Sequence, residues 1–365
     1  MAKLGEVCLL KAGKFVSAND ISPEYNKGLY PCFGGNGIRG YVADYTHDGE
    51  FPLIGRQGAL CGNVNLASGK FHATEHAVVV QPKIEMNVHW LYYALNAMNL
   101  GQYATGAAQP GLAVSKLETL SIEIPNISEQ NKIAQTLYKV EQLVNFRKQQ
   151  LAKLDELVKA RFVEMFGDEQ TFNKEPLSQN VEEMFIGPFG SSLKNENFVS
   201  KENGYCMVYE QKHAIRKTMD VETRYIDKPK YEELKRFSIH GGDIIVSCRG
   251  TIGETYIIPL NAPLGIMHPS IMKIRVKDSI YNRVFFDFLL QENLKQHEAQ
   301  ANGSGVKMAV TASALGKEEF IVPSIPLQKQ FSSFVERVDQ QKQTVQQSLE
   351  KLELMKKALM QEYFG

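Results

Sequence analysis

The sequence predicts an α+β protein made of two related halves, in which each half carries a mixed domain followed by a long helix. The first observation is an internal repeat: from about Leu112 onward, residue i resembles residue i + 198 over about 50 positions, and both copies end on Phe-Gly. The second is an earlier shared phrase at an offset of 192, "IGRQGALCGNVN" at 54–65 and "VSCRGTIGETY" at 246–256. The third is that the regions between the repeats are rich in β-branched residues and in Gly, Pro and Asn turns. Together they predict a pseudo-two-fold repeat.

These patterns divide the chain into four segments. We expect mixed domains at 1–125 and 168–324, and a spacer helix after each of them, at 126–167 and 325–365. Each mixed domain also contains one shorter helical stretch among its strand-like runs. Because loops on a fixed scaffold commonly carry recognition, the variable loops of the mixed domains are expected to make the functional contacts.

The two long helices are the clearest structural prediction. Apolar residues recur at steps of three and four through 128–166 and 326–364, which places one apolar seam along each helix. A helix of about 39 residues would be close to 60 Å long, too long for one domain to cover, so we expect the two helices to pair antiparallel as an internal coiled coil. The alternative is that each helix packs only on its own domain. The predicted seam residues are Ile133, Leu137, Val140, Leu151, Leu154, Phe331, Val335, Val338, Leu349 and Leu352.

Composition excludes several classes of protein. The 365 residues include 41 basic and 41 acidic side chains, so no overall positive field points to a polyanion, although a local patch is compatible with a neutral total. The five cysteines are scattered without a Cys-x-x-Cys pair, which favours reduced thiols over disulfides or a zinc site. The sequence shows no signal peptide and no apolar run of about 18 residues, so we expect a cytoplasmic protein with no membrane partner.

Catalytic motifs are missing from the sequence. The Gly-x-Gly-x-x-Gly pattern at 35–40 is followed by strand-like residues rather than a helix, so it predicts a tight hairpin at Asn36-Gly37 and not a dinucleotide site. The chain has no P-loop, no Asn-Pro-Pro-aromatic tetrapeptide, no His-Glu-x-x-His and no Gly-x-Ser-x-Gly. His76 and His268 lie at the same distance from a repeated Gly and are interpreted as equivalent packing residues. We therefore expect no catalytic residue, metal or cofactor on this chain.

A duplicated, non-catalytic scaffold with two divergent loop-bearing domains suits a linear target with two parts. Duplex DNA is such a target, because half-sites about one helical turn (roughly 34 Å) apart mirror the two-fold symmetry of a protein. Since the two halves of this chain differ in sequence, the two half-sites should differ as well.

The sequence also resembles a known family. The stretches "FPLIGRQGALCGNVNLASGKFHATEHAVVV" (51–80), "YPCFGGNGIRGYV" (30–42) and "EQNKIAQTLYKVEQLVNFRKQQLAKLDELVKARFVEMFG" (129–167) are similar to the specificity subunit of type I restriction–modification systems. The resemblance covers essentially the entire chain. It implies two target-recognition domains, each of which reads one half of a split, asymmetric DNA site. It also implies that the paired helices set the gap between the half-sites and dock two methyltransferase subunits.

The same resemblance implies the remaining partners and cofactors. Methyltransferase subunits would supply S-adenosylmethionine for adenine-N6 methylation, and restriction subunits that translocate DNA would join for cleavage. S-adenosylmethionine, ATP and Mg²⁺ are therefore expected on partner subunits, and none of them on this chain.

The family transfers no DNA-reading residues, so these are predicted from chemistry. Arginine reads guanine and amides read adenine in the major groove, whereas Lys and Ser mainly hold phosphates. The alternative for each is a solvated loop residue or, for Arg56 and Arg249, an arginine that braces its own loop. The predicted residues are Asn36, Arg39, Arg56, Gln57, Lys70 and His72 in the first domain, and Ser191, Lys194, Lys212, Arg216, Arg249 and Lys307 in the second.

Three other functions stay open at the level of sequence. One is a coiled-coil scaffold that assembles proteins without binding DNA. Such a scaffold would not show a DNA affinity that falls steeply with salt, as phosphate contacts do. A second is a self-contained methyltransferase or nuclease, against which the missing motifs argue. The third is a specificity subunit for a fused methyltransferase–nuclease partner.

Overall fold

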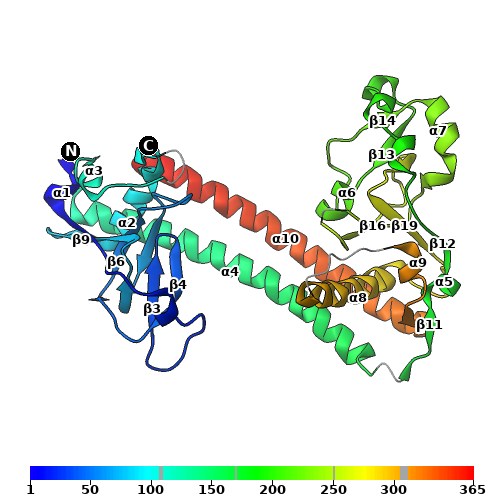
Figure 1. The fold of residues 1–365 in the computed structure, drawn as a ribbon, viewed down its shortest axis with the longest axis horizontal. Helices are drawn as coiled ribbons and strands as arrows, with labels where there is room; N and C mark the ends of the chain where they lie inside the picture. The colour runs from blue at the N-terminus through cyan, green and yellow to red at the C-terminus, as the bar shows by residue number, and fades with distance from the viewer. Residues whose placement is uncertain (107–109, 169–170, 250, 305–310) are drawn as a thin grey trace. The chain divides into compact units, whose positions relative to one another are not determined.

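The computed structural model describes residues 1–106, 110–168, 171–249, 251–304 and 311–365 (Figure 1). The chain forms two compact units, one of Met1–Leu151 with Thr344–Gly365 and one of Ala152–Gln343. The predicted class, α+β with an internal repeat and two long helices, is confirmed. Each unit takes part of both long helices, so the four-segment division of the sequence stays a prediction.

The described part of unit 1 holds three sheets. One is antiparallel with the order β2-β9-β6-β7, and another has the order β4-β3-β8-β5, in which β3 and β8 are parallel. A third sheet pairs β1 with β10. The strands are β1 (Ala2–Lys3), β2 (Cys8–Ala12), β3 (Tyr30–Gly34), β4 (Gly37–Val42), β5 (His47–Asp48), β6 (Phe51–Gly55), β7 (Val64–Ala67), β8 (Lys70–Ala73), β9 (Ala77–Pro82) and β10 (Ser121–Ile122).

The sheets of unit 2 repeat this arrangement strand for strand. Their orders are β12-β19-β16-β17, β14-β13-β18-β15 and β11-β20, which are the orders of unit 1 with ten added to each strand number. The parallel pair recurs as β13 and β18. The strands are β11 (Lys174–Pro176), β12 (Val181–Ile186), β13 (Cys206–Tyr209), β14 (Tyr225–Ile226), β15 (Ser238–Ile239), β16 (Ile244–Ser247), β17 (Thr255–Ile257), β18 (Gly265–Met267), β19 (Ile271–Val276) and β20 (Glu319–Ile321).

Helices connect and cover these sheets. The predicted shorter helix of each domain is present, as α2 (Val88–Ala97) and α8 (Arg283–Ser304). The side chain of Asn87 caps α2 by accepting from the N–H of Trp90 at 2.9 Å, as asparagine commonly does at this position. The other helices are α1 (Leu4–Val7), α3 (Val114–Glu118), α5 (Leu177–Asn180), α6 (Gln211–Arg216), α7 (Lys228–Leu234) and α9 (Ala312–Leu315), with 3₁₀ turns η1 (Ala18–Asp20), η2 (Leu100–Tyr103), η4 (Gly190–Ser192), η5 (Asn195–Asn197), η6 (Lys201–Asn203) and η7 (Lys235–Phe237).

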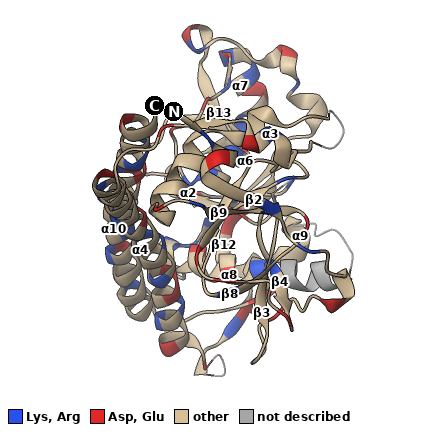
Figure 2. Cartoon of the chain, turned by 90° about the vertical axis from the view of Figure 1, so that its left-hand side faces the viewer, with Lys and Arg blue, Asp and Glu red and all other residues tan. Residues whose placement is uncertain are grey.

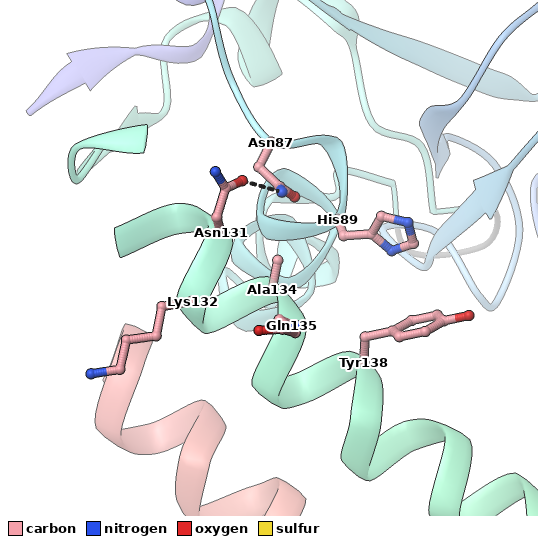
Figure 3. Close-up of a pocket in the computed structure, with 7 residues that line it drawn as sticks. All are labelled: Asn87, His89, Asn131, Lys132, Ala134, Gln135 and Tyr138. Carbon is pink, nitrogen blue, oxygen red and sulfur yellow. Dashed lines mark hydrogen bonds between the residues drawn. The ribbon is translucent and has the colours of Figure 1, made fainter. Parts of the chain in front are cut away.

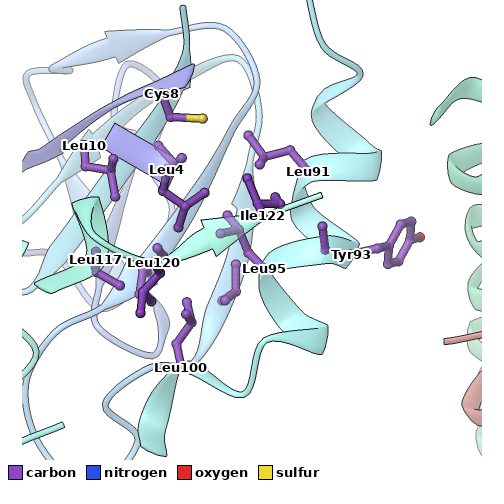
Figure 4. Close-up of a cluster of buried hydrophobic side chains, with 14 of the residues drawn as sticks. Leu4, Cys8, Leu10, Leu91, Tyr93, Leu95, Leu100, Leu117, Leu120 and Ile122 are labelled. Carbon is purple, nitrogen blue, oxygen red and sulfur yellow. The ribbon is translucent and has the colours of Figure 1, made fainter. Parts of the chain in front are cut away.

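The core of unit 1 joins its mixed domain to the long helices. Leu4, Leu91 and Leu117, from three different helices, meet in one buried cluster (Figure 4). The same cluster includes Leu137 of the first long helix, and the partly buried Phe364 of the second packs against it. The domain therefore shares one continuous hydrophobic core with the segments of both helices that belong to its unit.

The two long helices, α4 (Ile127–Phe166) and α10 (Ile325–Phe364), pair antiparallel within each unit. In unit 1, Glu141 meets Lys356 at 2.6 Å, whereas the later residue Lys148 meets the earlier Glu353 at 3.2 Å. In unit 2, the rings of Phe162 and Phe331 lie 5.6 Å apart. The predicted antiparallel pairing is confirmed, and the alternative of two helices that each pack only on their own domain is wrong.

The seam between α4 and α10 is apolar with a few polar substitutions. Lys342 and Lys356 stand where the repeat of α4 has valine, and their ammonium groups reach Asp155 at 2.5 Å and Glu141 at 2.6 Å. Such half-exposed pairs contribute about 0–1 kcal/mol each, against about 1.5–3 kcal/mol for a buried aliphatic side chain, so the apolar residues dominate. Of the predicted seam residues, Leu151 and Leu352 are half-buried. The others are buried: Ile133, Leu137, Val140, Leu154, Phe331, Val335, Val338 and Leu349.

A buried glutamine near the start of each long helix fastens the mixed domain to it. Gln130 accepts from the N–H of Asn87 at 2.9 Å and donates to the carbonyl of Pro125 at 2.8 Å. Gln328 makes the same bonds in unit 2, accepting from Asn282 at 2.8 Å and donating to the carbonyls of Pro323 and Ile280. The two side chains are 2% and 0% exposed, so no water replaces these partners.

Replacing either glutamine by leucine should destabilise the protein, because buried backbone groups lose their partners while the volume stays similar. We expect Gln328→Leu to lower the free energy of unfolding by about 2–4 kcal/mol and Gln130→Leu by less, since Gln328 makes one bond more. Denaturant unfolding measures both, with the exposed Gln341→Leu on α10 as the control. Equal unfolding midpoints for Gln328→Leu and Gln341→Leu would contradict the account.

Candidate nucleic-acid interface

In unit 1, one tight turn at residues 74–77, between β8 and β9, holds three loops together. The N–H groups of Gly13 and Arg56 donate to carbonyls of this turn at 3.0 Å each. The N–H of Thr74 donates to the carbonyl of Phe33 at 2.9 Å. The segment after β2, the β3–β4 hairpin and the loop after β6 therefore meet at a single point of the backbone.

The equivalent turn of unit 2, residues 268–271, is bonded in the same way. Gly187 donates to it at 3.0 Å and Cys248 at 2.9 Å, and His268 donates to the carbonyl of Tyr209 at 2.9 Å. Arg56 and Cys248 are thus equivalent, so the exposed residues that follow them, Gln57 and Arg249, hold the same position in the two frames. The repeated phrase noticed in the sequence is this shared frame with a different side chain on it.

The predicted equivalence of His76 and His268 is wrong. His268 occupies the place of Thr74, because each accepts the bond that closes its turn, from Ile271 at 3.2 Å and from Ala77 at 3.0 Å. The offset between the halves is 192 at the loop after β6 but 194 at the turn, since the connection is two residues longer in the second half. The equal spacing in the sequence is a coincidence.

The loops of unit 1 enclose a hollow of about 550 Å³. It is lined by residues 34–39 of the β3–β4 hairpin, by Gln57 and Gly58, and by His76. A hairpin was predicted here, but its two central residues are Gly35 and Asn36, one position earlier than expected, because Gly34 pairs with Gly37. A Cβ on Gly55 would lie 2.0 Å from the carbonyl of Gly35, so glycine is needed where the hairpin crosses the end of β6.

The corresponding end of unit 2 carries a charged cluster around Glu210. Its carboxylate is 2.9 Å from the ammonium of Lys212 and also pairs with Arg224, whose guanidinium lies 4.0 Å from the ring centre of Phe198. Burial raises the pKa of Glu210, but the hydrogen bonds and charges of its two cationic partners outweigh it, so the pKa lies below the usual value. An ionised Glu210 leaves one net positive charge on this group.

Most of the predicted DNA-reading residues lie in accessible places, although they do not all lie together. Asn36, Arg39 and Gln57 line the hollow of unit 1, and Asn36 accepts from Asn63 at 2.9 Å. The Nε of Arg56 is buried and bonds to no described residue. The exposed residues are Asn36, Arg39, Gln57, Lys70, Ser191, Lys194, Arg216 and Arg249, while Arg56 and Lys212 are half-buried.

Two of the predicted residues lie on strand β8, and one lies outside the described residues. His72 is wrong as a DNA contact, because it lies on β8, is 8% exposed, and its ring bonds the carbonyls of Lys14 and Asp44. Lys70 begins the same strand, at the end away from the turn, and lies 4.7 Å over the ring of Tyr45. Lys307 lies outside the described residues.

Sequence reasoning missed other residues at this interface. Nothing in the sequence places Arg224 beside Glu210, which lies 14 positions away. Phe15 and Phe189 were also missed, although the sequence carried a signal in the "GKF" at 13–15 and the "GPF" at 187–189. Both phenylalanines are highly exposed, at 76% and 86%.

The described residues contain no group of three or more His, Cys, Asp or Glu side chains arranged to hold a metal ion. The five cysteines are all unpaired, and burial raises the pKa of Cys8, Cys206 and Cys248 to about 11, so these thiols stay protonated. Among the described residues, no helix is both long enough and apolar enough to cross a bilayer.

Duplicated sheets, paired helices and the same set of turn bonds in each domain define a two-domain protein built from one repeated unit. The family model for the type I restriction modification DNA specificity domain matches residues 1–156 and 190–354, and the chain belongs to this family. Over 143 residues, 39% of this chain, it is 53% identical to the type I restriction enzyme EcoprrI specificity subunit of Escherichia coli. The chain covers 36% to 60% of the length of five curated relatives that it matches.

Solved structures share the fold along the whole chain. The S subunit of a type I restriction–modification system from M. genitalium superposes with a TM-score of 0.64 at 18% identity, covering 100% of this chain and 95% of that one. A chain from a study of complex assembly and conformational transition of the type I restriction–modification system superposes with a TM-score of 0.54 at 14% identity, covering 100% and 96%. At these identities the likeness is one of fold.

Mild acid should destabilise unit 2 through the buried His213 and the half-buried His268. Burial lowers the pKa of His213 and His268 below 6.5, so the folded state keeps them neutral while the unfolded chain binds protons. The stability that this provides is complete above pH 6.5 and is lost as the pH falls through the lowered values. Denaturant unfolding between pH 7.5 and pH 5 should show this loss, and His268→Gln should reduce it. An unchanged pH slope in that variant would exclude His268 as a source.

Proposed function

We propose that this chain recognises a bipartite, asymmetric site in duplex DNA and directs the methyltransferase and restriction subunits of a type I restriction–modification complex to it. The chain itself would be non-catalytic, and the reactions would belong to its partners. Family membership supports this assignment.

The observation that carries the proposal is a pair of identical frames with different side chains on them. Both domains share one strand order and one set of turn bonds, yet Gln57 in the first frame stands where the second has Arg249. An amide pairs with the N6 and N7 edge of adenine, whereas a guanidinium pairs with the O6 and N7 edge of guanine. Two copies of one frame that carry different readers suit a site whose halves differ in sequence.

The outer faces of the long helices support a dock for the partner subunits. Outside the seam of α4, Tyr138 is 45% exposed, Leu143 46% and Phe146 60%, and Leu354 of α10 is 68% exposed. Charged residues of both signs lie along the two helices (Figure 2). A hollow of about 550 Å³ beside Tyr138, where His89 of α2 faces α4, adds a concave feature to this surface (Figure 3). Apolar side chains between charges are typical of protein interfaces.

S-adenosylmethionine, ATP and Mg²⁺ would act on the partner subunits. This chain would supply the position of the target adenine, which a methyltransferase must extrude from the duplex to reach. A fused methyltransferase–nuclease partner would use the same surfaces of this chain, and the neighbouring genes would distinguish it from separate subunits. We expect the assembled complex to act in the cytoplasm.

Mapping of N6-methyladenine across the genome tests the proposal. A split, asymmetric motif should disappear when the gene is deleted and return with the wild-type chain. Complementing the deletion with the Arg249→Ala variant should make one base position of one half-site less specific, at a cost of about 1–3 kcal/mol in binding free energy. The other half-site should stay unchanged. A methylome that is the same with and without the gene, while the methyltransferase is active, would refute the function. Equal weakening at all sequences would make Arg249 a phosphate contact.

The proposed partner-binding surface of the long helices can be tested by introducing one charged side chain into it. Phe146→Glu should weaken binding to the methyltransferase by at least tenfold without changing the unfolding transition, because a charge replaces an exposed apolar side chain in the proposed contact. Isothermal titration of the purified subunits measures the affinity. Ile84→Glu is the matched control, since Ile84 is 47% exposed and lies off the helices. Equal losses in the two variants would contradict the placement of the dock.

A further inference from the structure

Phe15 and Phe189 hold the same backbone position in the two domains. Each lies two residues after a glycine, Gly13 or Gly187, which follows β2 or β12 directly and whose N–H donates to the turn. Neither glycine can carry a side chain, since a Cβ would lie 2.0 Å from the carbonyl of Ala73 in unit 1 and 2.3 Å from that of His268 in unit 2. Each phenylalanine therefore follows an equivalent glycine by two residues, although the residue between them differs: the N–H of Lys14 donates to the carbonyl of Ala73 at 2.9 Å, whereas Pro188 has no N–H.

Their exposure is unusual because it is duplicated. A single exposed apolar residue needs no explanation in a folded protein. Here, however, the residues on either side differ, with Lys14 and Val16 in the first domain against Pro188 and Gly190 in the second. The phenylalanine is the same in both halves and is 76% and 86% exposed. A feature common to both domains fits a task that does not depend on base sequence.

The position of these residues points to the duplex as their contact. The segment that carries each phenylalanine is bonded to the same turn as the loop that carries Gln57 or Arg249. If the proposed duplex contacts those loops, the shared turn would bring it close to the chain segment that carries the phenylalanine. Lys14 precedes Phe15, and Ser191 and Lys194 follow Phe189, so each phenylalanine has a possible phosphate donor within five positions along the chain. Lys194 also lies 3.8 Å from Glu196, which partly offsets its charge.

We propose that Phe15 and Phe189 are apolar wedges that press on base steps of the duplex, one at each half-site. Exposed phenylalanines serve this purpose in DNA-bending proteins, where they unstack a step whatever its sequence. The inference rests on the proposed function and deepens it. It assigns the unstacking of bases to the two phenylalanines that both domains share, and the reading of bases to side chains that differ between the domains. Such a distortion would ease the extrusion of a nearby adenine.

The test uses the full chain with its methyltransferase subunits and a duplex that contains the mapped site, with 2-aminopurine placed in turn along both half-sites. Fluorescence of the probe rises where a base is unstacked. We expect Phe15→Ala to abolish the rise in one half-site and Phe189→Ala in the other, each with about a tenfold or greater loss of affinity for cognate and scrambled duplexes alike. Phe189→Leu should restore part of the signal.

Leu260→Ala is the matched control, because Leu260 is 78% exposed in the same unit as Phe189. It should leave the fluorescence and the affinity unchanged. If both phenylalanine variants keep the parent's fluorescence profile while Arg249→Ala still relaxes one base, the wedge is wrong and the proposed function stands. If they instead weaken assembly with the methyltransferase, they are protein contacts and the wedge is equally wrong. A parent complex that does not prefer the mapped site overturns both.

Discussion

The loop end of each domain depends on the backbone hydrogen bonds of one tight turn, 74–77 in the first domain and 268–271 in the second. These bonds anchor three segments of each domain at one point. The segments are those at the ends of β2, β3 and β6 in the first domain and of β12, β13 and β16 in the second. These bonds are made by main-chain groups, so they place no demand on most side chains near them. The side chains of the loops can therefore vary while the backbone frame stays the same.

A second set of buried bonds carries that frame onto the long helices. Gln130 and Gln328 each fasten the start of a domain helix to the start of a long helix, and within each unit the two long helices pair through an apolar seam. The acidic partners of Lys342 and Lys356 explain how α10 tolerates lysine at two seam positions where the repeat in α4 has valine. Within each unit, the mixed domain is therefore joined to the long helices by buried hydrogen bonds.

The sequence predicted the features that recur with a period. Repeats, helical seams and strand-like runs are local or self-similar, so the two long helices, their pairing and the α+β class could be predicted from them. Features that depend on distant contacts were missed or misplaced. His72 looked like a loop residue, but it is buried against Lys14, which lies 58 positions away. His76 and His268 looked equivalent, because a two-residue length difference is invisible without the turn bonds. Arg224 is placed near these loops by its ion pair with Glu210, which the sequence does not reveal.

Photo-crosslinking from the two equivalent loops tests the central claim most directly. A benzoylphenylalanine in place of Gln57 or Arg249, in the full chain with its methyltransferase, would be irradiated on a duplex that contains the mapped site. The account predicts crosslinks to one half-site from position 57 and to the other from position 249. Crosslinks from both positions to the same half-site, or crosslinks from position 70 in place of position 57, would contradict it.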